Sequence, residues 1–196
     1  PRGLYMRGEK MNARSDDELV AGFQNGDETC FNELVYRYKN ILYQYILVMV
    51  RDEGAADDIF QEVFLNFYRR IKKYHPEGKL KSYLFTSARN RILNFFRDGN
   101  KMFSLDDTDE EGNTYLHDGL ASNDPQPLEK LEQEELAARI RNASLRLPPR
   151  QREAIYLKQY MTFREAAELL GRPLGTVLAD HYRGVQKMQK LLKEEA

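Results

Sequence analysis

The residues best suited to a chemical task lie in the stretch 73–97, where cations and amides alternate with aromatic side chains. Tyr74 and Tyr83 stand near Lys79 and Lys81 in this stretch. Lysine side chains neutralise phosphates, and aromatic rings stack on unpaired bases. The pattern therefore indicates a surface for single-stranded nucleic acid, although a solvated helix face is the commoner origin of such a composition.

A second candidate is a helix-turn-helix late in the sequence. Thr162 and Glu165 have the spacing of a capping box at the start of a short helix, which Gly171 can end in a left-handed conformation. A longer helix follows with Gly175 and Thr176 in its first turn, where free backbone N–H groups favour an anion. Such a pair places its second helix in the major groove of DNA, so the pattern favours a DNA-binding unit over a plain helical hairpin.

Other kinds of site are not indicated. The sequence has no GxxxxGK[ST] phosphate-binding loop and no Ser-His-Asp arrangement. The three histidines, His75, His117 and His181, lie far apart, and the single cysteine, Cys30, has apolar neighbours. We therefore expect no metal site, no cofactor and no enzymatic activity, and we expect Cys30 to be a core residue of a cytoplasmic protein.

Charge divides the 196-residue chain into three parts. Residues 1–97 hold 16 Lys and Arg against 13 Asp and Glu, residues 98–129 hold 1 against 9, and residues 130–196 hold 13 against 9. Two mildly basic blocks thus flank an acidic connector without apolar periodicity. We interpret the connector as an interdomain linker, which is either a solvated spacer or an acidic strand that occupies a channel built for nucleic acid.

The elements that must position these residues are helices, because apolar residues in both blocks recur at helical spacing. Ser15 and Glu18 predict a capping box for a first helix through Phe23, and Asp27 can cap the second. The apolar stripe of the second helix consists of Phe31, Leu34, Val35, Tyr38, Leu42, Tyr45 and Met49. We therefore expect these residues to form the core of a first helical domain.

Two further helices complete the first block. After a break over 51–54, a helix over 56–70 buries its apolar side and leaves Asp57, Asp58, Gln61 and Glu62 on or beside its exposed side. The Pro-Gly loop 73–79 leads into a helix that begins near Leu80. Its outward residues are predicted to be Lys81, Arg89, Asn90, Asn94 and Arg97.

The second block is also predicted to be helical. A charged helix spans 128–145, another follows Pro148 and Pro149, and the helix-turn-helix closes the block. In the last helix the predicted buried stripe is Val177, His181 or Tyr182, Val185, Met188 and Leu192. The sequence thus predicts an all-α protein of two small helical domains joined by a flexible acidic linker. No stretch approaches the roughly 18 apolar residues of a membrane span, so we expect no membrane insertion.

Both blocks resemble parts of one family in the right order. ADDIFQEVFLNFYRR resembles region 2 of sigma-70-type RNA polymerase sigma factors, LKSYLFTSARNRILNFFR resembles its promoter-melting part, and LPPRQREAIYLKQYMTFREAAELLGRPLGTV resembles region 4. The lack of a region 3 domain is typical of the extracytoplasmic-function (ECF) group. The resemblance implies region 2 over 15–97, an acidic linker over 98–127 and region 4 over 128–196. We expect residues 1–14 to be a disordered segment that precedes the first domain or residues left from protein expression, with Met6 or Met11 as the native start.

The resemblance also implies roles for individual residues. Asp57, Asp58, Gln61 and Glu62 match the segment that binds the clamp helices of the polymerase beta-prime subunit, and the beta subunit is a further expected contact. The residues that match the -10 recognition and melting face are Tyr74, His75, Lys79, Lys81, Tyr83, Arg89, Asn90, Asn94 and Arg97. The residues expected at -35 DNA are Arg164, Gly175, Thr176, Tyr182, Arg183 and Lys187. An anti-sigma factor is an expected partner by analogy.

One departure lies in the recognition helix. After the GTV motif the family usually has basic and small polar residues, whereas this chain has Leu178, Ala179 and Asp180. Asp180 would repel phosphates if it faced the duplex. The departure leaves three interpretations open: an altered -35 sequence, a weak -35 contact compensated elsewhere, or a region 4 that mainly binds protein. The expected function is promoter recognition and melting by a sigma factor, and the alternatives are a sigma-like protein-interaction module or a simple helix-turn-helix regulator.

Overall fold

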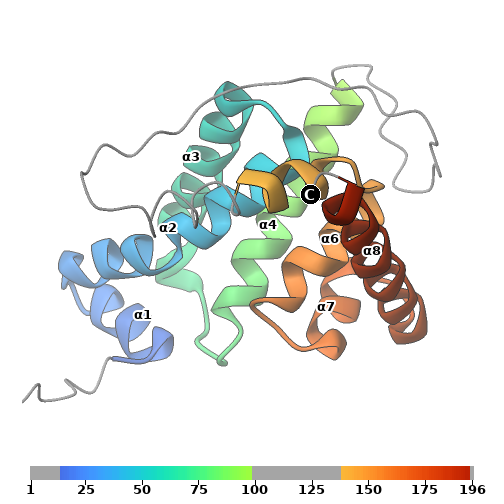
Figure 1. Cartoon of the computed structure of the whole chain (residues 1–196). Helices are drawn as coiled ribbons and strands as arrows, with labels where there is room; N and C mark the ends of the chain where they lie inside the picture. Colours follow the sequence, from blue (N-terminus) through green and yellow to red (C-terminus); the bar gives the residue numbers. More distant parts are fainter. Residues whose placement is uncertain (1–13, 99–137, 195–196) are drawn as a thin grey trace, which may run out of the picture.

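The structure, a computed structural model, describes residues 14–98 and 138–194 (Figure 1). In these ranges the regular elements are helices, so the all-α prediction is confirmed. They are α1 (Asp16–Gln24), α2 (Glu28–Val50), α3 (Glu53–Arg70), the 3-10 turn η1 (Ile71–Lys73), α4 (Leu80–Asp98), α6 (Pro149–Lys158), α7 (Phe163–Leu170) and α8 (Leu174–Glu194). Residues 138–145 are helical as well. The predicted lead, the acidic linker and the first part of the predicted 128–145 helix lie outside the described residues.

Side-chain caps fix where the helices of the first block begin. The Ser15 and Glu18 capping box at α1 is present, and Asp27 accepts a hydrogen bond from the Thr29 N–H at the start of α2, as predicted. The helix α3 begins at Glu53, earlier than the predicted residue 56, because the Asp52 side chain accepts from the Ala55 N–H. The break before it is therefore short, with Arg51 in the left-handed conformation (φ 59°).

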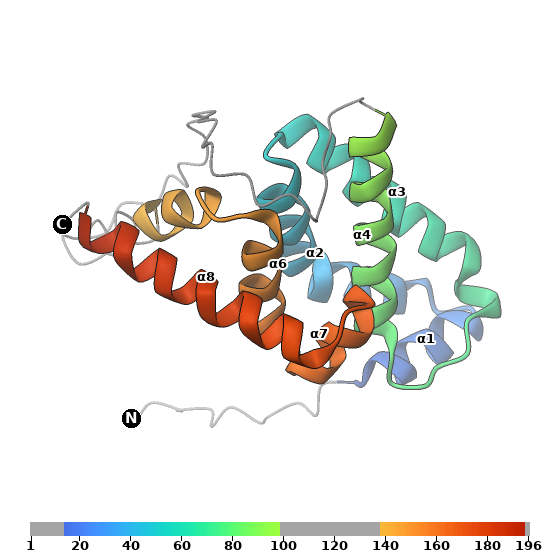
Figure 2. The same cartoon turned by 90° about the vertical axis from the view of Figure 1, so that its right-hand side faces the viewer.

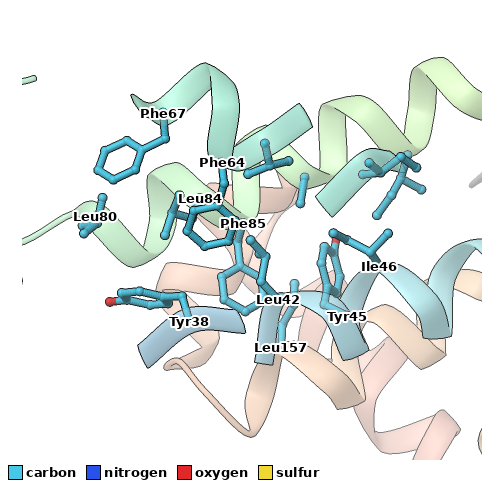
Figure 3. Close-up of a cluster of buried hydrophobic side chains, with 14 of the residues drawn as sticks. Tyr38, Leu42, Tyr45, Ile46, Phe64, Phe67, Leu80, Leu84, Phe85 and Leu157 are labelled. Atoms are coloured by element: carbon cyan, nitrogen blue, oxygen red, sulfur yellow. The ribbon is translucent and has the colours of Figure 1, made fainter. Parts of the chain in front are cut away.

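The core of the first block lies between α2, α3 and α4. Figure 3 shows Leu42 and Tyr45 of α2 facing Phe64, Leu84 and Phe85 from α3 and α4. Leu42, Tyr45, Leu84 and Phe85 have no exposed surface. Cys30 is also fully buried, as predicted for a core residue. Burial of these side chains fixes which faces of α3 and α4 remain at the surface.

The second block packs on the first. Figures 1 and 2 show α6 and α7 beside α4, with α8 on the outer side, and α6 also contacts α2. Leu157 of α6 belongs to the same buried cluster as Leu42 and Phe85 (Figure 3). The apolar core therefore continues from one sequence block into the other.

The helix-turn-helix has the predicted local structure. Thr162 and Glu165 form the capping box of α7, and Gly171 ends α7 with a φ of 63°. The helix α7 begins at Phe163, directly after its cap residue Thr162. Pro149 occupies the first turn of α6, also as predicted.

The buried face of α8 differs from the predicted one. The buried residues of this helix are Val177, Asp180, Gly184 and Leu191. Val177 is buried as predicted, and of the two alternatives His181 is partly buried while Tyr182 is 64% exposed. Val185, Met188 and Leu192 are partly buried, so the predicted stripe lies at the edge of the buried face. The helix is rotated relative to the prediction because Gly184 lets α6 approach closely at a position where a larger side chain would not fit.

Substituting Gly184 tests this close approach. An alanine Cβ at position 184 would lie 2.8 Å from Ile155 Cδ1, 3.1 Å from Gln151 Cβ and 3.3 Å from the Gln151 carbonyl oxygen, whereas a Cβ at Gly175 would meet no atom within 4 Å. Both substitutions gain helix propensity, but only Gly184→Ala overpacks an interface, which costs about 1–3 kcal/mol. We expect the free energy of unfolding in urea to be lower for Gly184→Ala than for Gly175→Ala by that amount. Equal stabilities would contradict the packing described.

Candidate functional site

A polar patch covers one side of α3. Its four members, Asp57, Asp58, Gln61 and Glu62, are all exposed, as predicted. The opposite side of α3 is held in the core by Ile59 and other apolar residues. Glu62 also forms a 2.6 Å ion pair with Arg91 of α4. Because both charges of this pair remain partly solvated, the patch stays available to a partner.

The loop between η1 and α4 is fixed by hydrogen bonds from α1. The Gln24 side chain donates to the carbonyl oxygens of Ile71 and Tyr74, each at 2.7 Å. Asp17 accepts from the Gly78 N–H at 2.9 Å, and Gly78 has a φ of 68°, which favours glycine. The loop is therefore held in one conformation at its start and near its end.

An aromatic cluster lies under this loop. The rings of Tyr74 and Tyr83 are 5.4 Å apart, and both pack on Phe67. Burial raises the pKa of Tyr74, with Asp17 adding to the effect, so its phenol stays neutral. The two tyrosines remain partly accessible, and His75 and Lys79 beside them are exposed. Cations and accessible ring faces thus occur together, as the sequence predicted.

The outward face of α4 is only partly as predicted. Asn90 and Arg97 are exposed, and Asn94 is half-buried. Lys81 and Arg89 were expected to face solvent, and this expectation is wrong. Lys81 Nζ donates to the Tyr160 carbonyl oxygen at 2.9 Å, and Arg89 contacts α6, because the second block packs against this side of α4.

A buried carboxylate joins the two blocks. Glu153 of α6 is 1% exposed, and its Oε1 accepts from the Tyr45 hydroxyl at 2.9 Å and from Arg89 Nε at 3.1 Å. Its Oε2 accepts from Arg172 at 3.2 Å. Burial raises the pKa of Tyr45 well above its ordinary value, so the hydroxyl remains a donor to Glu153. A buried charge is tolerated only when it is paired and hydrogen-bonded, and Glu153 has three such partners.

Two further contacts support this interface. The Tyr156 hydroxyl donates to the Ile41 carbonyl oxygen at 2.6 Å, and Arg51 donates to the Leu145 carbonyl oxygen. Arg152 is also buried here, at 2% exposure, and burial together with the charge of Arg51 lowers its pKa to about 9. The structure gives no hydrogen-bond partner for its Nε and NH1 atoms. A buried polar group without a hydrogen bond lowers the net stability of the surrounding structure.

The helix α8 presents a surface with cations along one side. Of the six residues predicted to contact DNA in this block, five are exposed and Thr176 is half-buried; the exposed ones are Arg164, Gly175, Tyr182, Arg183 and Lys187. Gln186 donates to the Tyr182 hydroxyl at 2.9 Å. The first turn of α8, with Gly175 exposed, is open to close approach by another molecule.

Asp180 does not face the surface where DNA was expected. It is 8% exposed, and its carboxylate lies 3.6 Å from Arg172 NH1 on the inner side of α8. Its charge is thus balanced within the protein. Repulsion of DNA phosphates by Asp180, which the sequence suggested, is therefore not supported.

Comparison with known proteins identifies the family. The sequence model of Sigma-70 region 2 matches residues 34–102, and that of Sigma-70 region 4 matches residues 137–188. The ECF RNA polymerase sigma factor SigW of Bacillus subtilis is 28% identical over 175 residues, which cover 87% of this chain and 93% of SigW. The chain belongs to the ECF group of sigma-70 family factors. It is a promoter-directing sigma factor, as the sequence resemblance implied.

Two further comparisons support this assignment. The ECF RNA polymerase sigma factor BldN of Streptomyces coelicolor is 28% identical over 187 residues, which cover 91% of the sigma factor described here and 66% of BldN, just under two thirds. The solved structure of the sigma factor RpoE in complex with the anti-sigma factor NepR from Bartonella quintana has a TM-score of 0.63 at 21% identity, and it covers 83% of this chain and 96% of RpoE. The latter likeness shows the shared fold. No helix among the described residues is long and apolar enough to span a membrane.

Sequence reasoning missed the residues that join the two domains of the sigma factor. Glu153 and Tyr45 are 108 residues apart, and nothing local in the sequence pairs them. The one local signal was Glu153 itself, a charged residue at a helical position where an apolar residue is expected. Arg172 likewise appeared to be a turn residue, although its side chain reaches Glu153.

Removing the Glu153 carboxylate tests the interface. Glu153→Ala leaves Arg89 and Arg172 partly buried without their shared acceptor, which costs about 3–5 kcal/mol in comparable buried pairs. The matched control is Glu77→Ala, which breaks the exposed 3.2 Å pair with Lys79 and should cost less than about 1 kcal/mol. Thermal and urea unfolding of the two variants measure the difference. Similar losses in both would show that the Glu153 contacts do not hold the domains together.

Proposed function

We propose that the α3 patch of Asp57, Asp58, Gln61 and Glu62 binds the clamp helices of the polymerase beta-prime subunit. The observation that carries this proposal is that four polar residues lie exposed on one side of a helix whose other side is fixed in the core. A rigid helix presents its side chains at little entropic cost, which favours a defined protein contact. The position of the patch within the region 2 match supports the same assignment.

We further propose that the loop 74–79 and the adjacent side of α4 capture unpaired bases of the -10 element. The partly accessible Tyr74 and Tyr83 rings offer stacking surfaces, each worth about 1–3 kcal/mol per base. Lys79, Asn90 and Arg97 add cationic and amide groups at the surface. Capture of flipped bases offsets the cost of unstacking, so strands separate without covalent chemistry or nucleotide hydrolysis by this chain. The helix α8 then contacts the -35 element.

The contact between the domains suggests that the free protein is closed. Lys81 and Arg89 belong to the proposed -10 face, yet they bind Tyr160 and Glu153 of the second domain. These cations cannot contact DNA while they hold the second domain. We infer that binding to core polymerase separates the domains and frees both cations. Core polymerase then holds the two DNA-contacting surfaces at promoter spacing. DNA binding by one surface therefore raises the effective concentration of DNA at the other surface.

The expected partners follow from the same surfaces. Core polymerase and promoter DNA are the partners that the α3 patch, the -10 face and α8 would serve. We also propose an anti-sigma factor that holds this protein inactive, since RpoE, which shares its fold, was solved with the anti-sigma factor NepR. Action on chromosomal promoters places the protein in the cytoplasm.

A charge reversal tests the proposed polymerase contact. Gln61→Lys with Glu62→Lys places two cations at the centre of the α3 patch, and like charges or unpaired groups at an interface centre cost several kcal/mol. We expect affinity for purified core polymerase to fall at least a hundredfold in a pull-down or anisotropy titration.

The control is Glu28→Lys with Gln44→Lys, which makes the same charge change at exposed positions of α2. This variant should bind core polymerase as the parent does. Unchanged affinity of the Gln61 and Glu62 variant, with its fold intact by circular dichroism, would remove the basis of the proposed contact.

A further inference from the structure

The recognition helix carries an apolar stripe on its outer side. Leu174, Leu178 and Tyr182 follow one another at four-residue intervals and are 41%, 41% and 64% exposed. Residues four apart share one side of a helix, so the three side chains form one continuous surface. They are exposed, whereas Val177 and Gly184 of the same helix are buried. Exposed apolar residues arranged in this way on a DNA-contacting element call for a specific explanation.

The charged residue among them does not belong to this surface. Asp180 is buried and lies 3.6 Å from Arg172, so it neither repels DNA nor offers an acceptor to bases. In the first two turns, the exposed side of α8 consists of Leu174, Gly175 and Leu178. None of these side chains can form a hydrogen bond to a base edge.

The surroundings of the stripe favour DNA over a protein partner. Arg183, Lys187 and Lys190 are exposed on the following turns of α8, and Arg164 is exposed at the start of α7. An apolar stripe at the start of a helix that exposes cations on its later turns complements a groove whose floor holds the bases and whose edges carry phosphates. In a helix-turn-helix, residues near the start of the second helix contact the base edges.

We propose that Leu178 determines -35 specificity by apolar contact with the C5-methyl groups of thymine, in place of hydrogen bonds to guanine. In the major groove the thymine methyl is the one base feature that an aliphatic side chain recognises. Leu174 and Tyr182 extend the contact along the groove, while Arg183 and Lys187 bind phosphates and set the register. This inference rests on the proposed -35 contact of α8, and it resolves the departure from the family pattern as altered readout.

Removing the methyl group tests the contact directly. A promoter fragment is first selected from genomic DNA of the host by holoenzyme made of core polymerase and the full chain. Two versions are then synthesised, with either thymidine or deoxyuridine at the upstream element only. The exchange removes the methyl group and changes no hydrogen-bonding group. We expect holoenzyme affinity to fall about threefold to fourfold for each contacted methyl group that is lost. Leu178→Ala should bind the thymidine fragment more weakly and show a smaller preference for thymidine over deoxyuridine than the parent.

The control variant is Ile140→Ala, which truncates an exposed apolar residue outside α8 and should keep the full preference for thymidine. The role of Leu178 would be overturned if the parent holoenzyme bound both fragments equally, or if the upstream element had no thymine on either strand. Either result would leave the sigma function in place. A holoenzyme that protects no upstream DNA in footprinting would overturn this inference together with the -35 contact. The same preference for thymidine in the parent and in Leu178→Ala would assign the methyl contact to another residue and reject the proposal.

Discussion

The arrangement of the two domains depends on one buried carboxylate. Glu153 has almost no exposed surface, so its charge is stable only with donors from three directions. Tyr45 comes from α2, Arg89 from α4, and Arg172 from the turn between α7 and α8. These donors belong to both domains, and thus Glu153 fixes the second domain against α2 and α4 of the first. The orientation of α8 follows, because Arg172 also pairs with Asp180.

The same interface explains how one set of cations can serve two states. In the closed chain, Arg89 pairs with Glu153 and Lys81 donates to a backbone carbonyl oxygen, whereas at a promoter both would pair with phosphates. Both cations therefore have a partner in either state. Core polymerase needs to offset the contacts that Glu153 and the Tyr160 carbonyl oxygen lose on opening.

Local features of this protein were predictable from its sequence, and distant contacts were not. The capping boxes at Ser15 and Thr162, the left-handed Gly171 and the exposed α3 patch depend on residues within a few positions of one another. In α8 the prediction found Val177 but missed Gly184 and Leu191 as buried residues, because the close fit of Gly184 against Gln151 of α6 sets the phase of the helix. Lys81 and Arg89 were assigned to solvent because their partners come from the other domain. Asp180 was judged by its charge alone, while its burial depends on the side chain of Arg172.

We infer that the domains are closed in the free chain and separate on core polymerase. Donor and acceptor dyes at cysteines introduced for the exposed residues Gln44 of α2 and Lys193 of α8, in a Cys30→Ser background, report the separation by energy transfer. We expect higher transfer efficiency in the free chain, a decrease when core polymerase is added, and a decrease without polymerase in Glu153→Ala. Equal transfer in the free and bound states, unaffected by Glu153→Ala, would contradict it.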